Sequence, residues 1–491
     1  MARAFPPDAV LLGPRPMAAA DAATIAAGMP GIALMERAGR AVVRAITARF
    51  EPRPALVLCG PGNNGGDGWV VARRLAALGW PVEVRSLVDR GMLAGDAAAA
   101  AARYGGPWST ADPAAPEPDT LVLDALFGAG LDRPLDGRPR AWVELLRAHP
   151  GPIVAIDVPS GVDGATGAVL GAAAPAALTV GFCRPKPGHL LLPGRGLAGE
   201  LVIADIGIPD AVVAAVDEGV RVNVPALWES AWPRRDATAH KYRFGHAVVV
   251  GGPVHATGAT RLAARAALRA GAGLVSVAAR PEALPVYAAA LTTVMTKPCA
   301  DARALEGLLA DPRLDAWLIG PGAGTGEETR AAVTVLLRSG RSLVLDADAL
   351  TAFAGQREAL LAALHGGCVL TPHDGEYARL FAHSGDRLAR ARLAAAESGA
   401  IVLLKGADTV VAAPDGRAAI LDRAPPALAT AGTGDVLAGF VLGLLAQGVP
   451  AFEAAAAAAW LHARAGERVG PGLIAEDLPE ALPALLARLG R

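Results

Sequence analysis

Amide and carboxylate side chains crowd a glycine-rich stretch near the N-terminus, which reads GPGNNGGDG from Gly60 to Gly68. The stretch follows an apolar run, Ala55–Cys59, that predicts a buried strand. Its glycines match the G-x-G-x-x-G pattern of dinucleotide-binding loops, but the carboxylate of Asp67 would repel a pyrophosphate there. Oxygen donors on a loop whose glycines permit unusual backbone angles instead favour a hard cation, sugar hydroxyls or both. The alternative is a tight turn in which Asn and Asp cap the next helix.

Two later apolar runs also end in acids and glycines. Asp124 opens DALFGAG after the predicted strand Thr120–Leu123, and Asp157 opens DVPSGVD after Pro152–Ile156. Because ligands bind beyond the carboxyl ends of parallel strands, we expect all three stretches to line one site. A single acid after a strand is usually a helix cap, but three consecutive strand ends of this kind favour a binding site.

The second half of the chain carries a different signal, AGTGDVLAG, from Ala431 to Gly439. Glycines directly before a helix leave backbone N–H groups free to bind an anion, and the helix dipole adds to the attraction. Asp435, in the first turn, is placed to take a proton from a hydroxyl while these N–H groups stabilise a phosphoryl group in transfer. The alternative is that Thr433 or Asp435 only caps the helix.

Further predicted strand ends in the second half carry groups suited to the same chemistry. A histidine alone would more often be structural, but with such companions a ligand contact is favoured. No GxxxxGK[ST] stretch occurs, so a nucleotide must bind in another way than in a P-loop. The groups are Gly322 in GPGAG, Asp346 in LDADAL, His373 in TPHDGE and Lys405 in KGADT.

These residues need sheets to position them, and short apolar runs do alternate with helical patterns in both halves. This alternation predicts mostly parallel sheets covered by helices on both faces. The pattern lapses between Val222 and Tyr242, so we predict two domains, residues 1–222 and 223–491. The predicted helices span residues 18–47, 69–78, 94–104, 140–148 and 259–270, with an Ala-rich series from Asp435 onward. The predicted strands are 55–59, 81–87, 120–123, 152–156, 178–182, 201–204, 246–251, 274–278, 317–319, 343–345, 369–370 and 401–404.

Composition excludes several classes of protein. The net charge of −1 argues against a nucleic-acid partner, and 53% hydrophobic residues supply material for buried cores. Four scattered cysteines without a CxxC pair argue against a disulfide framework or a thiolate zinc site and fit a reducing, cytoplasmic location. Prolines and an aspartate interrupt the N-terminal apolar stretch, and glycines break the uncharged run 164–183, so we expect no signal peptide and no membrane partner.

Lysine is rare in this chain, since only four of the 46 basic residues are lysines. A lysine is therefore a candidate for a place that needs a compact ammonium group rather than a guanidinium fork, and chance retention is the alternative. The four are Lys186, Lys241, Lys297 and Lys405.

The motifs GNNGGDG, DALFGAG, DVPSGVD and FCRPKPGH resemble the epimerase domain of NAD(P)H-hydrate repair enzymes, over Met17 to Asp210. The resemblance implies a Rossmann-like three-layer α/β domain that holds K⁺ through Asn64, Asp124 and Ser160. It implies Asp163 as the acid–base residue, and Lys186 and His189 are further candidates for the same site. The hydrate pocket implied by the resemblance comprises Asn63, Asn64, Gly65, Gly66, Asp67, Gly128, Ala129, Gly130, Leu131, Asp132, Arg133, Pro134 and Asp157.

The second half, from about Lys241, resembles the ribokinase-like α/β fold and, more closely, ADP/ATP-dependent NAD(P)H-hydrate dehydratases. The motifs are HKYRFGH, GATRLAARAALRAGAGLV, GPGAG, LDADAL, TPHDGE, KGADT and GTGDVLAG. The turn GGPVHATGA, with Pro253 in place of the usual serine, and the loop ALATA depart from the family pattern. The resemblance implies Mg²⁺ bridging the phosphates, and hydrate contacts at Ala259, Gly322, His373 and Asp435. It implies nucleotide contacts at Lys405, Gly406, Ala407, Asp408, Thr409 and Gly434.

The sequence thus predicts a bifunctional repair enzyme whose epimerase converts the R hydrate to the S form and whose dehydratase restores NAD(P)H from it with ADP as co-substrate, giving AMP and phosphate. Its partners are small molecules, and we expect a homo-oligomer. A ribokinase-like small-molecule kinase with a sensor domain is the alternative, and its product would be a stable phosphorylated compound. In a third interpretation, the first domain is a non-catalytic binding module.

Overall fold

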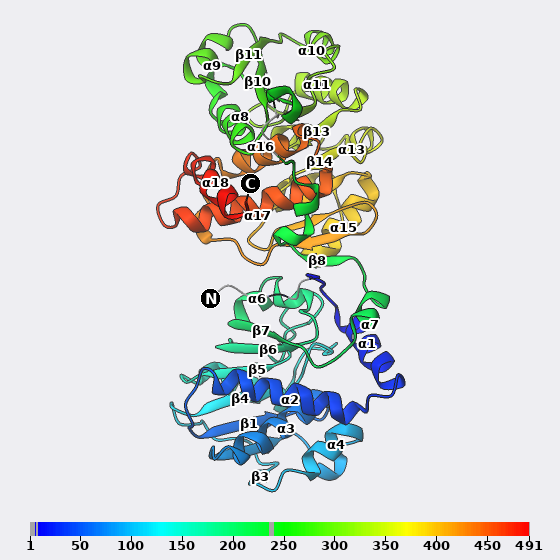
Figure 1. Cartoon of the computed structure of the whole chain (residues 1–491), viewed down its shortest axis with the longest axis vertical. Helices are drawn as coiled ribbons and strands as arrows, with labels where there is room; N and C mark the ends of the chain where they lie inside the picture. The colour runs from blue at the N-terminus through cyan, green and yellow to red at the C-terminus, as the bar shows by residue number, and fades with distance from the viewer. Residues whose placement is uncertain (1–4, 6–7, 235–239, 491) are drawn as a thin grey trace. The chain divides into compact units, whose positions relative to one another are not determined.

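The computed structural model describes residue 5 and residues 8–234 and 240–490. The chain forms two compact units, Met1–Val220 and Arg221–Arg491. Residues 235–239, within the segment predicted to join the two halves, lie outside the described residues. Each unit is built on its own sheet (Figure 1).

The described part of the N-terminal unit contains a seven-stranded sheet in the order β3-β2-β1-β4-β5-β6-β7, with every pair parallel. This Rossmann-like order reverses direction at β1, so a crevice opens beyond the carboxyl ends of β1 and β4. The strands are β1 (Ala55–Cys59), β2 (Val82–Ser86), β3 (Trp108–Ser109), β4 (Leu121–Ala125), β5 (Ile153–Ile156), β6 (Leu178–Phe182) and β7 (Glu200–Ala204).

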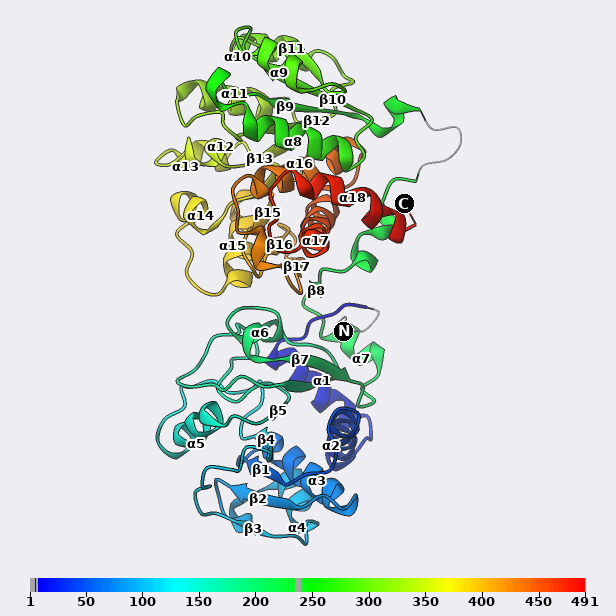
Figure 2. The ribbon, with the colours of Figure 1, turned by 90° about the vertical axis from the view of Figure 1, so that its left-hand side faces the viewer.

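Helices cover both faces of this sheet, as Figure 2 shows. Alternate residues of β1 explain why, because Val57 packs into one apolar core while Leu56 and Leu58 pack into another on the opposite face. The helices on the Val57 face are α1 (Pro14–Ala26), α2 (Gly31–Thr47), α3 (Asn63–Ala77), α4 (Gly95–Ala102) and α7 (Asp210–Ala215), and α5 (Gly137–Ala148) covers the other face. A short helix, α6 (Gly194–Leu197), precedes β7.

The described part of the C-terminal unit contains a ten-stranded sheet in the order β11-β10-β9-β12-β13-β14-β15-β16-β17-β8. The strands from β11 to β15 are parallel, whereas β16 and β17 form an antiparallel hairpin beside β15. The strands are β8 (Val220–Val222), β9 (His246–Val250), β10 (Leu274–Ala279), β11 (Met295–Pro298), β12 (Ala316–Ile319), β13 (Ser342–Leu345), β14 (Cys368–Leu370), β15 (Ile401–Leu404), β16 (Val410–Ala412) and β17 (Ala418–Ile420).

Helices α8 (Gly258–Arg269), α16 (Thr433–Ala446), α17 (Ala451–Val469) and α18 (Asp477–Arg488) lie on one face of this sheet and share its largest apolar core (Figure 2). Gly439 lets α16 lie close to α8, since a Cβ there would be 2.3 Å from the carbonyl oxygen of Ala263. The remaining helices are α9 (Leu284–Ala290), α10 (Ala302–Leu309), α11 (Glu327–Arg338), α12 (Asp348–Thr351), α13 (Arg357–Leu361), α14 (Asp374–Leu380) and α15 (Arg387–Ser398).

The predicted α/β fold class is confirmed, two local predictions need correction, and one hairpin was missed. The predicted helix 18–47 is two helices, because Gly28, with φ of +102°, and Pro30 end the first and begin the second. The β16–β17 hairpin was not predicted, since each of its strands has only three residues. Asp124 belongs to β4 rather than following it. None of the described helices has the length and apolar character needed to cross a bilayer.

Candidate active sites

The glycine-rich stretch after β1 is mostly helix rather than loop, because α3 begins at Asn63. Its glycines do not supply unusual backbone angles, since none from Gly60 to Gly68 has a positive φ. Because they lack a Cβ, they instead allow backbone segments to approach closely. A Cβ on Gly60 would lie 1.7 Å from the carbonyl oxygen of Leu126, and a Cβ on Gly65 would lie 2.0 Å from the carbonyl oxygen of Gly60. The turn of helix that carries the amide and carboxylate groups is thereby held tightly against the ends of β1 and β4.

Replacing Gly65 with alanine is expected to destabilise the N-terminal unit by about 1–3 kcal/mol, because the backbone oxygen of Gly60 cannot move away from the new Cβ. Gly62→Ala is the matched control, since nothing lies within 4 Å of a Cβ there and the expected change is below about 0.5 kcal/mol. Urea unfolding midpoints of the two variants measure the difference. Equal midpoints would contradict this account of the glycines.

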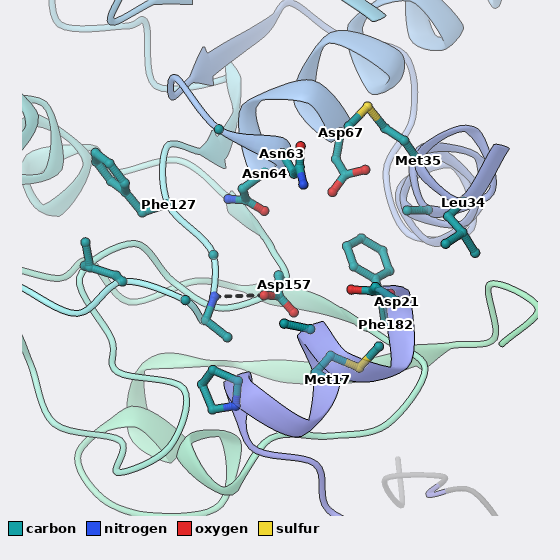
Figure 3. Close-up of a pocket in the computed structure, with 18 of the residues that line it drawn as sticks. Met17, Asp21, Leu34, Met35, Asn63, Asn64, Asp67, Phe127, Asp157 and Phe182 are labelled. Atoms are coloured by element: carbon teal, nitrogen blue, oxygen red, sulfur yellow. Dashed lines mark hydrogen bonds between the residues drawn. The ribbon is translucent and has the colours of Figure 1, made fainter. Parts of the chain in front are cut away.

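A cavity of about 670 Å³ opens at the carboxyl ends of the N-terminal strands, within the size range of small-molecule sites. Figure 3 shows Asn64, Asp67 and Asp157 turned into it from α3 and from the end of β5. Of the residues predicted for the hydrate pocket, the structure brings together in its wall Asn63, Asn64, Asp67, Gly128, Ala129, Gly130, Leu131, Asp132, Arg133 and Asp157. Gly65, Gly66 and Pro134 are not part of this wall.

Asp157 is the most heavily constrained acid in this cavity. It has a positive φ of 67°, and its carboxylate accepts hydrogen bonds from the Lys186 ammonium (2.6 Å) and the Ala129 amide (2.8 Å, dashed in Figure 3). The backbone N–H of Lys186 donates to Nδ1 of His189, so Nε2 of that ring carries the proton and donates to the Asp157 carbonyl at 2.7 Å. Burial alone would raise the pKa of Asp157, but the ammonium of Lys186 lowers it, and the group is ionised.

Asn64, Asp124 and Ser160, the three predicted cation ligands, differ in how well they are paired. The amide oxygen and nitrogen of Asn64 are buried and have no hydrogen-bond partner among the described residues. The carboxylate of Asp124 accepts from the Ser160 amide (2.8 Å) and hydroxyl (2.5 Å), and burial raises its pKa. Among the described residues, no cation contacts this group of oxygens, and a buried carboxylate is stable as an anion only beside a positive charge.

Asp163, the predicted acid–base residue, lies in a turn that its own side chain stabilises. Its carboxylate accepts the backbone N–H groups of Ala165 (2.7 Å) and Thr166 (3.1 Å), as an Asx turn does. It is absent from the wall of the cavity. The structure therefore places the carboxylate of Asp163 in this turn and not in the cavity wall.

In the C-terminal unit, helix α16 begins without a side-chain cap. Gly432, with φ of +86°, is the N-cap residue, and no side chain of the described residues accepts the first N–H groups of the helix. The hydroxyl of Thr433 donates instead to the carbonyls of Leu428 (2.9 Å) and Thr430 (3.0 Å). The capping alternative is thus wrong for Thr433 and Asp435, and the amides of the first turn remain suited to an anion.

Asp435 lies near an ion pair formed by two strand ends. Lys405, after β15, donates to Asp346, after β13, at 2.7 Å, and Asp346 also accepts the hydroxyl of Thr371 at 2.9 Å. A Cβ on Gly434 would lie 3.5 Å from the Lys405 ammonium, so this cation reaches the start of α16. Burial, followed by the charge of Asp346, raises the pKa of Asp435 to about 7, which places a base near neutral pH.

The other residues predicted for the second site belong to the same unit. His373 caps α14 through Nδ1, which accepts the amides of Gly375 (2.9 Å) and Glu376 (3.2 Å), so its exposed ring presents Nε2–H. Asp408 is paired with Arg387 at 2.8 Å, and the hydroxyl of Thr409 closes the turn on Gly406. Gly406 and Ala407 are exposed, and Ala259, Gly322 and Gly434 are partly exposed.

Each of the two units matches a known protein family. Residues 31–188 match the family of YjeF-related protein N-termini, and residues 247–483 match that of NAD(P)H-hydrate dehydratases. The bifunctional NAD(P)H-hydrate repair enzyme of Moorella thermoacetica is 40% identical, over 94% of this chain and 93% of its own. The enzyme of the same name from Escherichia coli is 34% identical, over 92% of this chain and 89% of its own. This chain belongs to the bifunctional NAD(P)H-hydrate repair enzymes.

As a member of this family, the repair enzyme combines two activities. One is an epimerase, which is a kind of isomerase, and the other is a dehydratase, which is a kind of lyase. A ribokinase-like superfamily protein of Enterococcus faecalis has a similar structure, with a TM-score of 0.50 and 27% identity over 55% of this chain and 96% of its own. This similarity confirms the ribokinase-like fold of the C-terminal unit. The family therefore decides against the kinase and the binding-module alternatives.

Two features of the repair enzyme's sites were not fully predicted from its sequence. The Asp157–Lys186 ion pair joins residues of two separate strand ends, and although the scarcity of lysine and the FCRPKPGH motif pointed to Lys186, neither predicted its pairing with Asp157. Asp21 of α1 also lines the cavity, and no motif pointed to it. The sequence did offer one signal for Asp21. It is a carboxylate in a helix that consists mostly of alanine and other apolar residues.

Proposed function

We propose that the repair enzyme interconverts the R and S hydrates in its N-terminal cavity and dehydrates the S form beside α16, with ADP as co-substrate and AMP and phosphate as products. The observation that supports the second step is the uncapped start of α16 with Asp435 in its first turn and Lys405 nearby. Such an arrangement can hold a phosphate through backbone amides and provide a base within the same turn.

The proposed dehydration has two steps. In the first step, Asp435 takes the proton of the hydrate's hydroxyl group. The oxygen of that hydroxyl attacks the terminal phosphoryl group of ADP, and AMP leaves. The phosphate then departs with the C–O electron pair, and loss of a proton from the adjacent carbon restores the double bond of NAD(P)H. The amides of Gly434 and its neighbours, with Lys405, would stabilise the charge on the transferring group.

We propose that the remaining predicted contacts serve these two substrates. Ala259, Gly322 and His373 would contact the hydrate, and the turn from Lys405 to Thr409 would contact the adenine nucleotide. Within the described residues, no cluster of three His, Cys, Asp or Glu side chains could hold a metal ion. This fits a Mg²⁺ that is bound chiefly by nucleotide phosphates and water, and Mg²⁺ so bound would neutralise phosphate charge.

We also propose that Asn64, Asp124 and Ser160 hold K⁺ in the N-terminal unit. The unpaired amide of Asn64 and the buried carboxylate of Asp124 fit a large monovalent cation, which takes oxygen ligands and supplies the missing charge. The ion would fix the start of α3 against the end of β4 and so position the cavity wall.

Epimerisation is accordingly expected to depend on K⁺. Replacing Asn64 with leucine removes the unpaired oxygen, and the K⁺ concentration that gives half-maximal epimerisation should rise by about 10-fold or more. Titrating KCl at constant ionic strength with tetramethylammonium chloride measures this concentration. Full epimerisation by both proteins without K⁺ would contradict the assignment.

The proposed function is tested by incubating the repair enzyme with mixed hydrate epimers and ADP or ATP. We expect both epimers to be recovered as reduced nicotinamide, seen by its absorbance, with one phosphate released per molecule. Recovery of the S form alone would remove the epimerase from the proposal. A stable phosphorylated product without absorbance would remove the dehydratase.

Further proposals concern the setting of the enzyme. Cys59, Cys183, Cys299 and Cys368 are free and buried, which supports a reducing, cytoplasmic compartment. We keep the expected homo-oligomer and the functional division into residues 1–222 and 223–491 as proposals. Asp163 also remains a proposed acid–base residue, and it is compared with a second candidate below.

A further inference from the structure

One face of helix α1 forms part of the cavity wall. The residues of this face recur at helical spacing, and all but one of them are apolar. The exception is Asp21, whose carboxylate faces the cavity in Figure 3. The face comprises Pro14, Met17, Ala18, Asp21 and Ile25.

Asp21 has no structural task that would explain a carboxylate at this position. It makes no hydrogen bond or ion pair with the described residues, and helix α1 packs into the core through Met17, Ala20 and Thr24. A partly buried carboxylate without such a partner costs stability, so packing alone would favour an apolar residue.

A second unpaired carboxylate, Asp67, lies in the same wall on α3. It also makes no hydrogen bond or ion pair with the described residues, and Figure 3 shows it turned into the cavity that Asp21 and Asp157 face. Of these three acids, only Asp157 has a cation, Lys186, within contact distance among the described residues. Asp21 and Asp67 are thus free to exchange protons, whereas Asp157 is fixed as an anion.

We propose that Asp21 and Asp67 are the acid–base pair of the epimerase, with Asp21 as the proton acceptor and Asp67 as the proton donor. This inference rests on the proposed location of epimerisation in this cavity. It adds a residue of α1 that lies outside the predicted site.

The chemistry of epimerisation needs such a pair. The hydroxyl of the hydrate lies on the carbon next to the ring nitrogen, because water adds to that end of an enamine. Asp67 donates a proton to this hydroxyl, the C–O bond breaks, and the nitrogen lone pair forms an iminium while water leaves. Water then adds to the opposite face of the carbon, and Asp21 takes the proton that this water loses. Proton exchange with solvent afterwards restores both acids.

The electrostatics of the cavity give the two acids different protonation states. Burial and the charges of Asp157 and Asp21 raise the pKa of Asp67 well above its usual value, which favours the protonated form that a proton donor needs. Burial raises the pKa of Asp21 to about 6, while Lys186 opposes the rise and Asp157 adds to it. Paired carboxyl groups with separated pKa values are typical of acid–base sites.

The titratable groups that interact with Asp21 are Asp67 on α3, Asp157 after β5 and Lys186 after β6, with the thiol of Cys183 beside them. Three further charged side chains line the same cavity, namely Asp96, Asp132 and Arg133. Because the charge of Lys186 lowers the pKa of Asp157, the titration near pH 6 belongs to Asp21. An acceptor must be ionised, so epimerisation by the unchanged enzyme should increase as pH rises through about 6.

The test compares Asp21→Asn, Asp67→Asn and Asp163→Asn in the full chain, with the exposed Asp119→Asn as a control. R-hydrate conversion is followed with S-hydrate dehydration as the internal measure of folding. We expect Asp21→Asn to reduce kcat for epimerisation by about 100-fold with little change in KM, and to remove the rise near pH 6. Asp67→Asn should lower the rate similarly, and Asp119→Asn and S-hydrate dehydration should be unchanged.

Three outcomes would overturn the proposal. The first is an Asp21→Asn variant with a normal rate. The second is one that keeps the rise near pH 6 and changes only KM, because Asp21 would then be structural. The third is a loss of epimerisation in Asp163→Asn with normal rates in both Asp21→Asn and Asp67→Asn. If Asn64→Leu and Asp157→Asn also epimerise normally, epimerisation does not take place in this cavity and the proposed function of the cavity is wrong. If those two variants are impaired while Asp21→Asn is normal, only the role of Asp21 is wrong.

Discussion

Replacing Asp435 with asparagine is expected to lower the rate of S-hydrate dehydration by about 10²- to 10⁴-fold while epimerisation continues at its normal rate. Asparagine preserves the size of the side chain but cannot accept the hydroxyl proton. The two reactions separate because Asp435 lies at the start of α16 in the C-terminal unit, whereas the acids of the epimerase cavity lie in the N-terminal unit. Single-turnover recovery of reduced nicotinamide from pure S hydrate and ADP measures the effect.

The pH dependence of the same reaction gives an independent check. Since burial raises the pKa of Asp435 to about 7, the base is protonated and inactive below that value, and dehydration should increase as pH rises through about 7. Exposed Glu476→Gln, in the same unit, is the control and should change neither rate nor profile. Loss of both activities in a folded Asp435→Asn protein would contradict the two-site arrangement.

Replacing Lys186 with methionine is expected to destabilise the N-terminal unit by about 3–5 kcal/mol and to abolish epimerisation. The Lys186 side chain is 2% exposed and that of Asp157 is 16% exposed, so the substitution leaves a buried carboxylate without its cation. In the unchanged protein the pKa of Asp157 is lowered, so its contribution to stability is present above the usual Asp range and is lost as pH falls through the lowered pKa. Urea unfolding monitored for each unit separately measures the loss.

The double variant Lys186→Met/Asp157→Leu separates stability from function. With both charges removed, most of the lost stability should return, because no unpaired charge remains, while epimerisation stays absent. Lys241→Met is the matched control: this exposed lysine lies 5.2 Å from the centroid of the Tyr242 ring, and its loss should cost less than about 1 kcal/mol. A fully stable Lys186→Met protein would show that Asp157 does not depend on the ammonium.

Much of the fold follows from local patterns. Apolar runs bounded by glycine, proline and acids predicted β1, β6 and β15 with their observed bounds, because a strand buried on both faces must be apolar throughout. Strand β8 and the strands of the β16–β17 hairpin have three residues each and were missed, because so short a run has no readable period.

The sequence predicted some residues of the sites correctly and others not. Ten of the residues predicted for the hydrate pocket do line one cavity, because parallel strands place their carboxyl ends at one edge of the sheet. The glycines near Asn64 were assigned the wrong task, since what they provide is close backbone approach, and this depends on segments distant in sequence. The position of Asp163 in a turn, outside the cavity wall, likewise becomes visible only in the structure, while its acid–base role stays a prediction.

By itself, the sequence determined the two α/β units, the acidic strand ends, the glycine turn before α16 and the family. Only the tertiary structure decided which of these groups are paired and which are not. It pairs Lys186 with Asp157 and Lys405 with Asp346, whereas Asp21, Asp67 and Asp435 have no cation in contact among the residues that the structure describes. The reason is physical: burial and contacts between distant segments set the charge state of a side chain, and neither is encoded in the spacing of residues along the chain.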